Sequence, residues 1–230
     1  MILLVGSSSG IGNKLLQYLL KFDDVFATYY KKKIKYSQKK KGNKLFIRKL
    51  DISKEKNIKN FILKNQKILK KVTFVNLATI SIDKLVPNIG LKDIRKVFNI
   101  NTFSNILFTK YLLKIMLKEN YGRFIFITST RASNGDIGLA LYSSSKSSLR
   151  SLSKCLSKEY GRYNITSNVI SLGYFNSPLL DNINTKLKQK LIDTVPSKKT
   201  GKVINISNTI KNIIKSNYIN GSEIKIDGGI

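Results

Sequence analysis

The chain opens with a short apolar run that leads directly into a glycine-rich turn. Residues Ile2–Val5 have the pattern of a buried strand, and the turn after them is spaced as Gly6-x-x-x-Gly10-x-Gly12. A helical repeat of apolar residues follows at Leu15, Leu16, Leu19 and Leu20. A strand, a glycine turn and a helix in this order form a unit whose helix N-terminus can hold a phosphate. The opening segment therefore predicts the first βα unit of a dinucleotide-binding fold.

Strand and helix patterns alternate through the rest of the chain. We expect further strands at 25–29, 45–48, 72–75, 123–128, 166–170 and 223–226, and helices at 54–69, 91–117, 142–160, 187–192 and 206–214. Ser53 is a candidate N-cap, and the long pattern over 91–117 should bend or break near 99–101. Such alternation predicts an α/β fold of the Rossmann type: a doubly wound, seven-stranded, mostly parallel sheet with helices on both faces. Residues 1–230 are expected to form one domain.

Composition excludes several classes of function. Lys and Arg number 42 against 13 Asp and Glu, a net charge of +29, which would attract polyanions. The lysines are scattered and form no basic arm with interleaved aromatic residues, so we interpret the charge as compositional drift rather than a nucleic-acid site. The chain has no histidine, and Cys155 is its only cysteine, which argues against zinc and an internal disulfide. With no apolar run long enough for a membrane span, we expect a cytoplasmic protein without a metal.

Tyr142 and Lys146 lie four residues apart, on one face of the expected helix 142–160. A tyrosine hydroxyl, with a pKa of about 10, is a poor acid–base group at neutral pH. A neighbouring ammonium lowers that pKa, so the pair could form a tuned proton donor. Taken alone, this spacing is better explained as a chance pair on the solvated face of a lysine-rich helix.

Two further residues change this interpretation. Ser129 follows the expected strand 123–128 and precedes Tyr142 by thirteen residues, and Asn101 lies in the preceding long helix. With the glycine spacing of the opening turn, this set resembles the Asn–Ser–Tyr–Lys active site of the short-chain dehydrogenase/reductase family, over nearly the whole chain. Each residue alone has a simpler explanation, such as Asn101 satisfying backbone groups at a helix irregularity. The order and spacing of the four favour the family.

The resemblance implies a catalytic role for each of the four residues. Ser129 would orient the substrate carbonyl, and Tyr142 would give its proton to the carbonyl oxygen as hydride arrives from a nicotinamide cofactor. Lys146 would hold the nicotinamide ribose and lower the pKa of Tyr142. Asn101 would hold a water that links Lys146 to solvent.

The resemblance also implies a set of cofactor contacts. The glycine turn would approach the pyrophosphate, and Asp51 would bind the adenine amino group. The full expected set is Gly6, Ser8, Ser9, Gly10, Ile11, Gly12, Tyr30, Lys31, Asp51, Ile52, Asn76, Ala78, Tyr142, Lys146, Gly173 and Ser177. The chain departs from the family pattern at Thr79, where a glycine is usual, and at Leu172, where a proline is usual.

The end of the second expected strand indicates which dinucleotide is used. An acid about 20 residues after the glycine turn would bind the ribose 2′-hydroxyl of NAD. The chain instead has Tyr30-Lys31 and further lysines there, and a basic residue can neutralise the 2′-phosphate of NADP. We therefore expect NADPH rather than NADH.

Within the family, the short segment 173–200 is similar to the lid of the 3-oxoacyl-acyl-carrier-protein reductases. This implies acyl carrier protein as the substrate carrier, with Arg123, Arg131 and Arg162 as candidate contacts near the entrance. It also implies a homo-oligomer, commonly a tetramer. Two alternatives stay open: a reductase of a sugar, polyol or other small carbonyl compound, and a catalytically idle member that binds nucleic acid or a partner.

Overall fold

The computed structural model describes residues 1–34, 36, 42–176 and 184–230. These residues form a seven-stranded sheet in the order β3-β2-β1-β4-β5-β6-β7, and every described strand pair is parallel. The strands are β1 Ile2–Val5, β2 Val25–Tyr29, β3 Leu45–Lys49, β4 Thr73–Asn76, β5 Gly122–Ser129, β6 Ile165–Leu172 and β7 Glu223–Ile226. The order reverses between β1 and β4, and ligands of such sheets bind at the carboxyl ends of the strands at this point.

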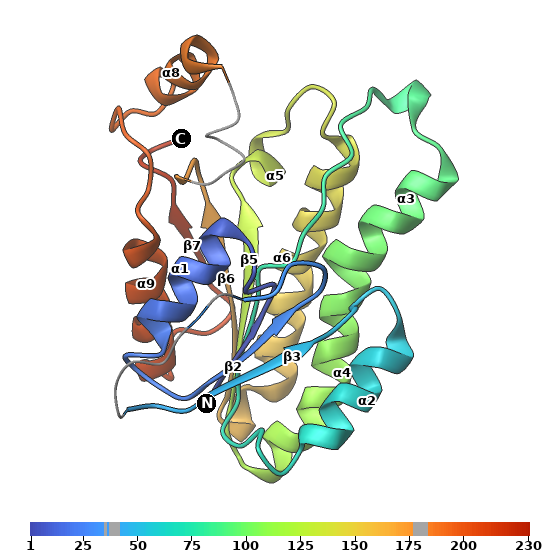
Figure 1. Ribbon diagram of the computed structural model, residues 1–230, viewed down its shortest axis with the longest axis vertical. Coiled ribbons are helices and arrows are strands. Elements are labelled where there is room, and N and C mark those ends of the chain that lie inside the picture. Colours follow the sequence, from blue (N-terminus) through green and yellow to red (C-terminus); the bar gives the residue numbers. More distant parts are fainter. Residues whose placement is uncertain (35, 37–41, 177–183) are drawn as a thin grey trace.

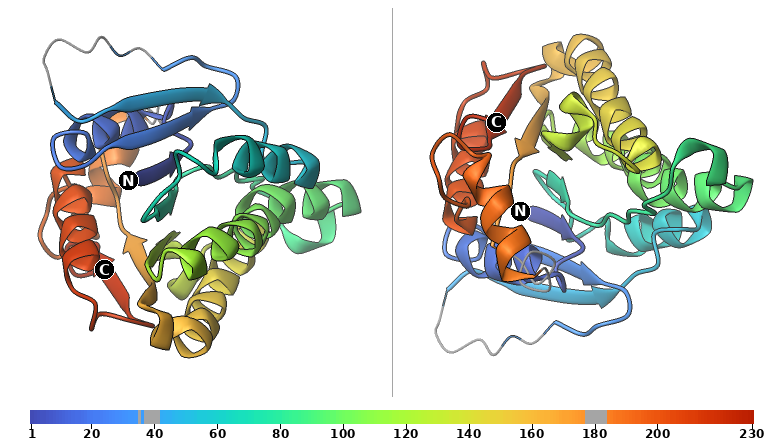
Figure 2. Two further views of the ribbon diagram at one scale, coloured as in Figure 1. Left: turned by 90° about the horizontal axis from the view of Figure 1, so that it is seen from below. Right: turned by 90° about the horizontal axis from the view of Figure 1, so that it is seen from above.

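Helices cover both faces of the sheet, as Figures 1 and 2 show. One face carries α1 Gly10–Leu19 and α9 Val203–Lys215, and the other carries α2 Glu55–Asn65, α4 Ser104–Lys118 and α6 Ala140–Tyr160. The shorter helices are α3 Leu91–Phe98, α5 Arg131–Asn134 and α8 Thr185–Asp193, with the turns η1 Val86–Asn88, η2 Asn99–Phe103 and η3 Gly161–Tyr163. This arrangement confirms the predicted doubly wound fold.

The two faces of the sheet have separate apolar cores. Side chains alternate along β1, so Ile2 and Leu4 pack with the α1 leucines and α9, whereas Leu3 and Val5 pack on the opposite side around Phe74. All four residues of β1 are buried. A strand that is buried on both faces must be apolar at every position, which explains the continuous apolar runs in the sequence.

The predicted break in the long helix 91–117 is a π-helical turn. The helical pattern separates into α3, η2 and α4. Side chains at the start of α4 bond two backbone carbonyls of η2. Ser104 Oγ donates to the Ile100 carbonyl at 2.6 Å, and Asn105 Nδ2 donates to the Asn101 carbonyl at 2.8 Å. A π-turn adds a residue to the helix and turns its side chain to a new direction. Asn101 is fully buried in this turn.

The expected start of the second helix was wrong. Helix α2 begins at Glu55 with Lys54 at the N-cap, and Ser53 caps nothing. The Ser53 backbone nitrogen and hydroxyl both donate to Asp51 Oδ1, at 2.9 and 2.7 Å. Aspartate readily forms such a local turn. Because both Ser53 donors are bonded to Asp51, Ser53 belongs to this turn and not to the cap of the helix.

In the described part of the chain, no helix combines the length and the apolar character that a membrane crossing requires.

Candidate active site

The glycine turn after β1 packs closely against the end of β4. Gly6 has φ +80°, and a Cβ at this position would lie 2.6 Å from the backbone nitrogen of Ala78. A Cβ on Gly12 would lie 2.5 Å from the Gly6 carbonyl oxygen. Only glycine allows both the positive φ and these approaches, so the turn and the β4 end meet at the switch point. Asn76 fixes the segment after β4, because its Oδ1 accepts from the Ala78 backbone nitrogen at 2.9 Å.

The N-terminus of α1 leaves backbone donors available at this place. Ser9 is the N-cap, and its Oγ accepts from the Gly12 nitrogen at 2.9 Å. Within the described residues, the backbone nitrogens of Gly10 and Ile11 have no protein acceptor. Free N–H groups at a helix N-terminus, with the helix dipole behind them, suit a phosphate. The turn therefore fits the pyrophosphate of a dinucleotide.

Ser129 and Tyr142 come together from β5 and α6. Ser129 is the last residue of β5, and Tyr142 lies in the first turn of α6. Burial of the Tyr142 phenol raises its pKa, while the nearby Ser129 hydroxyl and the positive charge of Arg131 both act to lower it. The sequence prediction that this serine and this tyrosine are neighbours agrees with the structure.

Lys146 lies one turn after Tyr142 and is buried. Its Nζ donates to the Ile127 carbonyl at 3.0 Å, and burial lowers its pKa from 10.5 to about 8. The effect of Lys146 on the pKa of Tyr142 stays a prediction, and the positive charge of Arg131 also acts to lower that pKa. The ammonium is engaged with the backbone of β5, and its own charge is poorly solvated.

Asn101 connects three segments through its side-chain amide. Its Oδ1 accepts from the Ile80 nitrogen at 2.9 Å and from the Thr79 hydroxyl at 3.0 Å. Its Nδ2 donates to the Ile80 carbonyl at 2.8 Å and to Ser145 Oγ at 2.9 Å. An amide has two donors and two acceptor sites, so these four bonds saturate it. The side chain has no free position for the expected water, and the simpler interpretation as a backbone-satisfying residue fits this structure better.

The serines between Tyr142 and Lys146 have specific partners that the sequence did not indicate. Ser145 Oγ donates to the Tyr142 carbonyl at 2.8 Å, which extends the Asn101 network to the catalytic helix. Ser143 Oγ donates to the Arg131 carbonyl at 3.0 Å. The only available signal was the run of small hydroxyl residues, and it does not identify partners that are distant in the chain.

Both departures from the family pattern make contacts in the structure. Thr79, which stands where a glycine is usual, gives Asn101 one of its four hydrogen bonds. Leu172, at the usual proline, is buried, and its carbonyl accepts from the Thr130 nitrogen at 3.0 Å. Both residues therefore contribute to the framework around the site.

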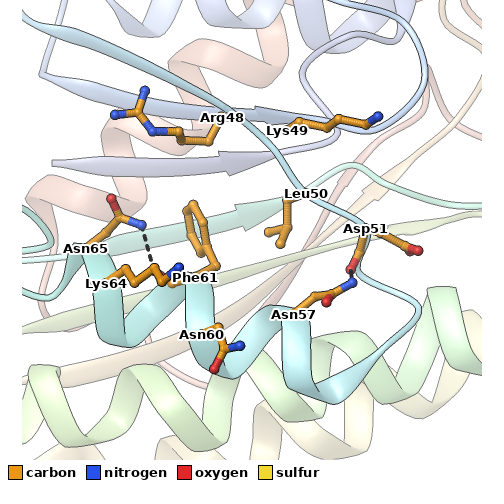
Figure 3. A pocket seen from close by; sticks show the side chains of 9 residues that line it. All are labelled: Arg48, Lys49, Leu50, Asp51, Asn57, Asn60, Phe61, Lys64 and Asn65. Carbon is orange, nitrogen blue, oxygen red and sulfur yellow. Dashed lines mark hydrogen bonds between the residues drawn. The ribbon is translucent and has the colours of Figure 1, made fainter.

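The remaining expected cofactor residues are spread along the carboxyl edge of the sheet. Asp51 follows β3 and is engaged by Ser53, while Tyr30 and Lys31 are exposed after β2. Gly173 follows β6, where a Cβ would lie 2.7 Å from the Asp227 Cα. Ser177 lies outside the described residues. The hollow shown in Figure 3 has Asp51 on its rim but runs between β3 and α2, and none of the four predicted catalytic residues lines it.

Two of the three arginines expected near the entrance are at the wrong end of the sheet. Arg123 lies at the start of β5 and is buried, with its guanidinium donating to the carbonyls of Gly122 and Asn164, each at 2.8 Å. Arg162 lies in η3, just before β6. Both positions are at the amino ends of strands, whereas Ser129 is at the carboxyl end. Arg131 alone lies beside the candidate site.

Comparisons with known proteins agree with this geometry. A family model described as short chain dehydrogenase matches residues 1–188, which include all four predicted catalytic residues. The 3-oxoacyl-[acyl-carrier-protein] reductase of Bos taurus is 27% identical over 78% of this chain and 75% of its own length. The reductase FabG of Rickettsia felis is 27% identical over 99% of this chain and 95% of its own. That of Buchnera aphidicola from Schizaphis graminum is 32% identical over 68% and 65%.

Proposed function

The chain belongs to the short-chain dehydrogenase family, and from this premise we propose that it reduces the keto group of a 3-oxoacyl thioester on acyl carrier protein, with NADPH as cofactor. Family membership makes it an NAD(P)-dependent oxidoreductase. The observation that carries the proposal is the grouping of Tyr142 and a buried Lys146, one turn apart on α6, with Ser129 at the end of β5 and a glycine turn that fits a dinucleotide.

The residues of the chain supply orientation and a proton. A bound nicotinamide would deliver a hydride to the carbonyl carbon. The Ser129 hydroxyl would donate a hydrogen bond to the carbonyl oxygen and hold it near Tyr142. The Tyr142 hydroxyl would transfer its proton to that oxygen, so that the carbonyl becomes a secondary alcohol and the tyrosine a phenolate. Gly10 and Ile11 would hold the pyrophosphate, Lys146 the ribose and Asp51 the adenine.

Two observations support an acyl substrate over a sugar or polyol. The relatives from Bos taurus and Rickettsia felis are named as 3-oxoacyl-[acyl-carrier-protein] reductases. In addition, the Lys84 backbone nitrogen donates to the Gly138 carbonyl, so two loops are joined. These loops carry the exposed apolar residues Leu85, Val86 and Ile137. An apolar surface on the loops that lead into α3 and α6 suits an acyl chain and gives a polyol few partners.

A homotetramer remains part of the proposal. The end of η2 and helix α4 expose Phe103, Ile106 and Leu117, which are 49%, 43% and 39% exposed in the single chain. An apolar stripe on a helix is suited to an isologous contact between copies.

Turnover of an acetoacetyl thioester tests the substrate. We expect NADPH oxidation with acetoacetyl-acyl carrier protein to be at least about tenfold more efficient than with sugar aldehydes or ketoses, because the acyl chain adds apolar contacts. The measurement is kcat/KM from the loss of nicotinamide absorbance. Turnover restricted to sugar substrates would establish the alternative reductase. No turnover, with salt-sensitive binding of RNA, would favour the idle member.

Lys31→Glu tests the cofactor. We expect the natural chain to have a lower KM for NADPH than for NADH, and the variant to lose about tenfold in affinity for NADPH, because an acid repels the 2′-phosphate. Lys70→Glu is the control, since Lys70 is equally exposed but lies before β4. Fluorescence titration of both cofactors measures the effect. A lower KM for NADH in the natural chain would refute the preference.

A further inference from the structure

The short helix α5 follows Ser129 almost directly, and hydrogen bonds are the main contacts that can hold it in place. It comprises the four residues Arg131–Asn134, of which only Ala132 is buried. A helix this short has no stability of its own, since an isolated helix needs about 12 to 15 residues. The sheet fixes the chain as far as Thr130, whose backbone nitrogen donates to the Leu172 carbonyl at 3.0 Å. Beyond this point, the position of α5 depends on its neighbours.

Side chains on one face of α6 bond three successive residues of α5, which lies beside the first half of that helix (Figure 1). Two of them are serine hydroxyls that donate to backbone carbonyls, at 3.0 and 2.7 Å, and the third is a guanidinium that donates to a hydroxyl. The donors are four and three residues apart, so they lie on the same side of α6. The pairs are Ser143 with Arg131, Ser147 with Ala132, and Arg150 with Ser133.

Arg150 is the member of this set that also bonds the sheet. Its Nε lies 2.9 and 2.8 Å from the two carboxylate oxygens of Glu223, and a terminal nitrogen donates to Ser147 Oγ at 3.1 Å. Glu223 begins β7, which pairs with β6. The Arg150 side chain is only 19% exposed. Because the donors of a planar guanidinium point in fixed directions, the carboxylate of Glu223 directs the remaining donors of Arg150 toward Ser133 and Ser147.

The hydrogen bond between α5 and Ser129 involves the hydroxyl of Ser129 and not its backbone. Ser129 is paired with Leu172 in the sheet, so β5 and β6 fix the backbone. The orientation of the side chain depends on the Arg131 backbone nitrogen, which donates to Ser129 Oγ at 3.3 Å. A serine oxygen that accepts this bond can still donate its own proton. A shift of α5 would therefore turn the hydroxyl without disturbing the strand.

We propose that Arg150 is a positioning residue for carbonyl reduction: its guanidinium holds α5 against α6, and α5 in turn orients the Ser129 hydroxyl for the substrate carbonyl. Arg150 acts through α5 and contacts neither substrate nor cofactor. The inference rests on the proposed function, because that function gives the Ser129 hydroxyl its task. Helix α6 then has two roles, since it supplies the proton donor Tyr142 and, through α5, orients the residue that holds the substrate.

A double-mutant cycle with Ser129 tests the proposal. Arg150→Met keeps a long apolar side chain but removes every donor, and we expect it to lower kcat about tenfold with little change in affinity for NADPH, because a misaligned group slows the chemical step. In the Ser129→Ala background the same change should lower kcat by less than about twofold, because no hydroxyl is left to orient. Single-turnover oxidation of NADPH measures the chemical step, and fluorescence titration measures cofactor affinity. Lys154→Met, at an exposed lysine one turn later on α6, is the matched control and should leave both values unchanged.

Two results of this cycle would overturn the proposal. One is an equal loss of kcat from Arg150→Met with and without the Ser129 hydroxyl, because a general defect of the fold would lower both values. The other is a kcat that Arg150→Met leaves unchanged. If Arg150→Met does not fold, Glu223→Gln and Ser147→Ala each remove part of the same network. Each should then give a smaller loss of kcat that also disappears in the Ser129→Ala background.

Hydrogen exchange of the backbone amides separates this inference from the proposed function, because it needs no substrate. Arg150→Met should speed exchange at Ser133, Asn134 and Gly135, whose amides bond the carbonyls of Thr130 and Arg131, while the amides of α9 keep their protection. Unchanged exchange at these three amides would overturn the inference whatever the substrate is. Faster exchange there, without turnover of any carbonyl compound, would refute the proposed function but retain the support of α5 by Arg150. If the enzyme reduces a sugar and not a thioester, the kinetic cycle is run with the sugar.

Discussion

Replacing Tyr142 with phenylalanine is expected to lower kcat for carbonyl reduction by about two to four orders of magnitude, the usual contribution of a positioned acid–base group. The hydroxyl carries the proton that the carbonyl oxygen must receive, and neither Ser129 nor Lys146 is placed to replace it. Ser129 Oγ accepts from the Arg131 backbone nitrogen at 3.3 Å, and Lys146 Nζ donates to the Ile127 carbonyl at 3.0 Å. The variant should fold normally, because the ring that fills the partly buried position is retained.

Three measurements distinguish loss of the proton donor from other defects. Single-turnover NADPH oxidation gives the chemical step, thermal unfolding gives the stability, and cofactor titration gives the binding. Tyr218→Phe is the matched control, because Tyr218 is 97% exposed and far along the chain from the site. A Tyr142→Phe enzyme whose kcat stays within about threefold of the natural value would remove Tyr142 from the mechanism.

The sequence predicted the features that local pattern determines. The strand periods, the turn at Gly6 and the break near Asn101 each depend on residues that are close in the chain, so spacing alone identifies them. The Ser129, Tyr142 and Lys146 spacing was similarly informative, because one strand end and one helix carry all three. The structure has every expected strand within two residues of its predicted ends.

What the sequence could not predict depends on contacts between distant segments. Spacing placed Lys146 one helical turn from Tyr142, but it did not indicate that Lys146 is buried with its Nζ on the Ile127 carbonyl and that burial lowers its pKa. Arg123 was expected at the surface, yet it is buried at the amino end of β5. Arg131 bonds Asp136 through its guanidinium and Ser143 through its carbonyl, and no periodic pattern connects these residues. Long-range partners of polar groups are the part of a site that residue spacing does not encode.

Asn101 presents the sharpest case, because two interpretations of one residue make different predictions. We expect Asn101→Ala to lower the free energy of unfolding by about 3 kcal/mol or more. The change leaves the partly buried Ile80 nitrogen and carbonyl and the buried Ser145 hydroxyl without their side-chain partner. A polar group left unpaired inside a protein costs about 1 to 3 kcal/mol. Denaturant unfolding measures this loss, with Asn60→Ala, at an exposed asparagine of α2, as the control.

Thr79→Val measures the contribution of one hydrogen bond to the network around the Asn101 side chain. It removes one of the four bonds of Asn101 and should cost about 1 kcal/mol, because the other three keep the amide in place. If Asn101 served only to hold a water for proton return, Asn101→Ala would instead reduce kcat at unchanged stability. A large loss of stability in Asn101→Ala, with a smaller loss in Thr79→Val, would mean that Asn101 holds the loop after β4 and helix α6 together. The geometry of Tyr142 would then depend on a π-turn more than forty residues before it.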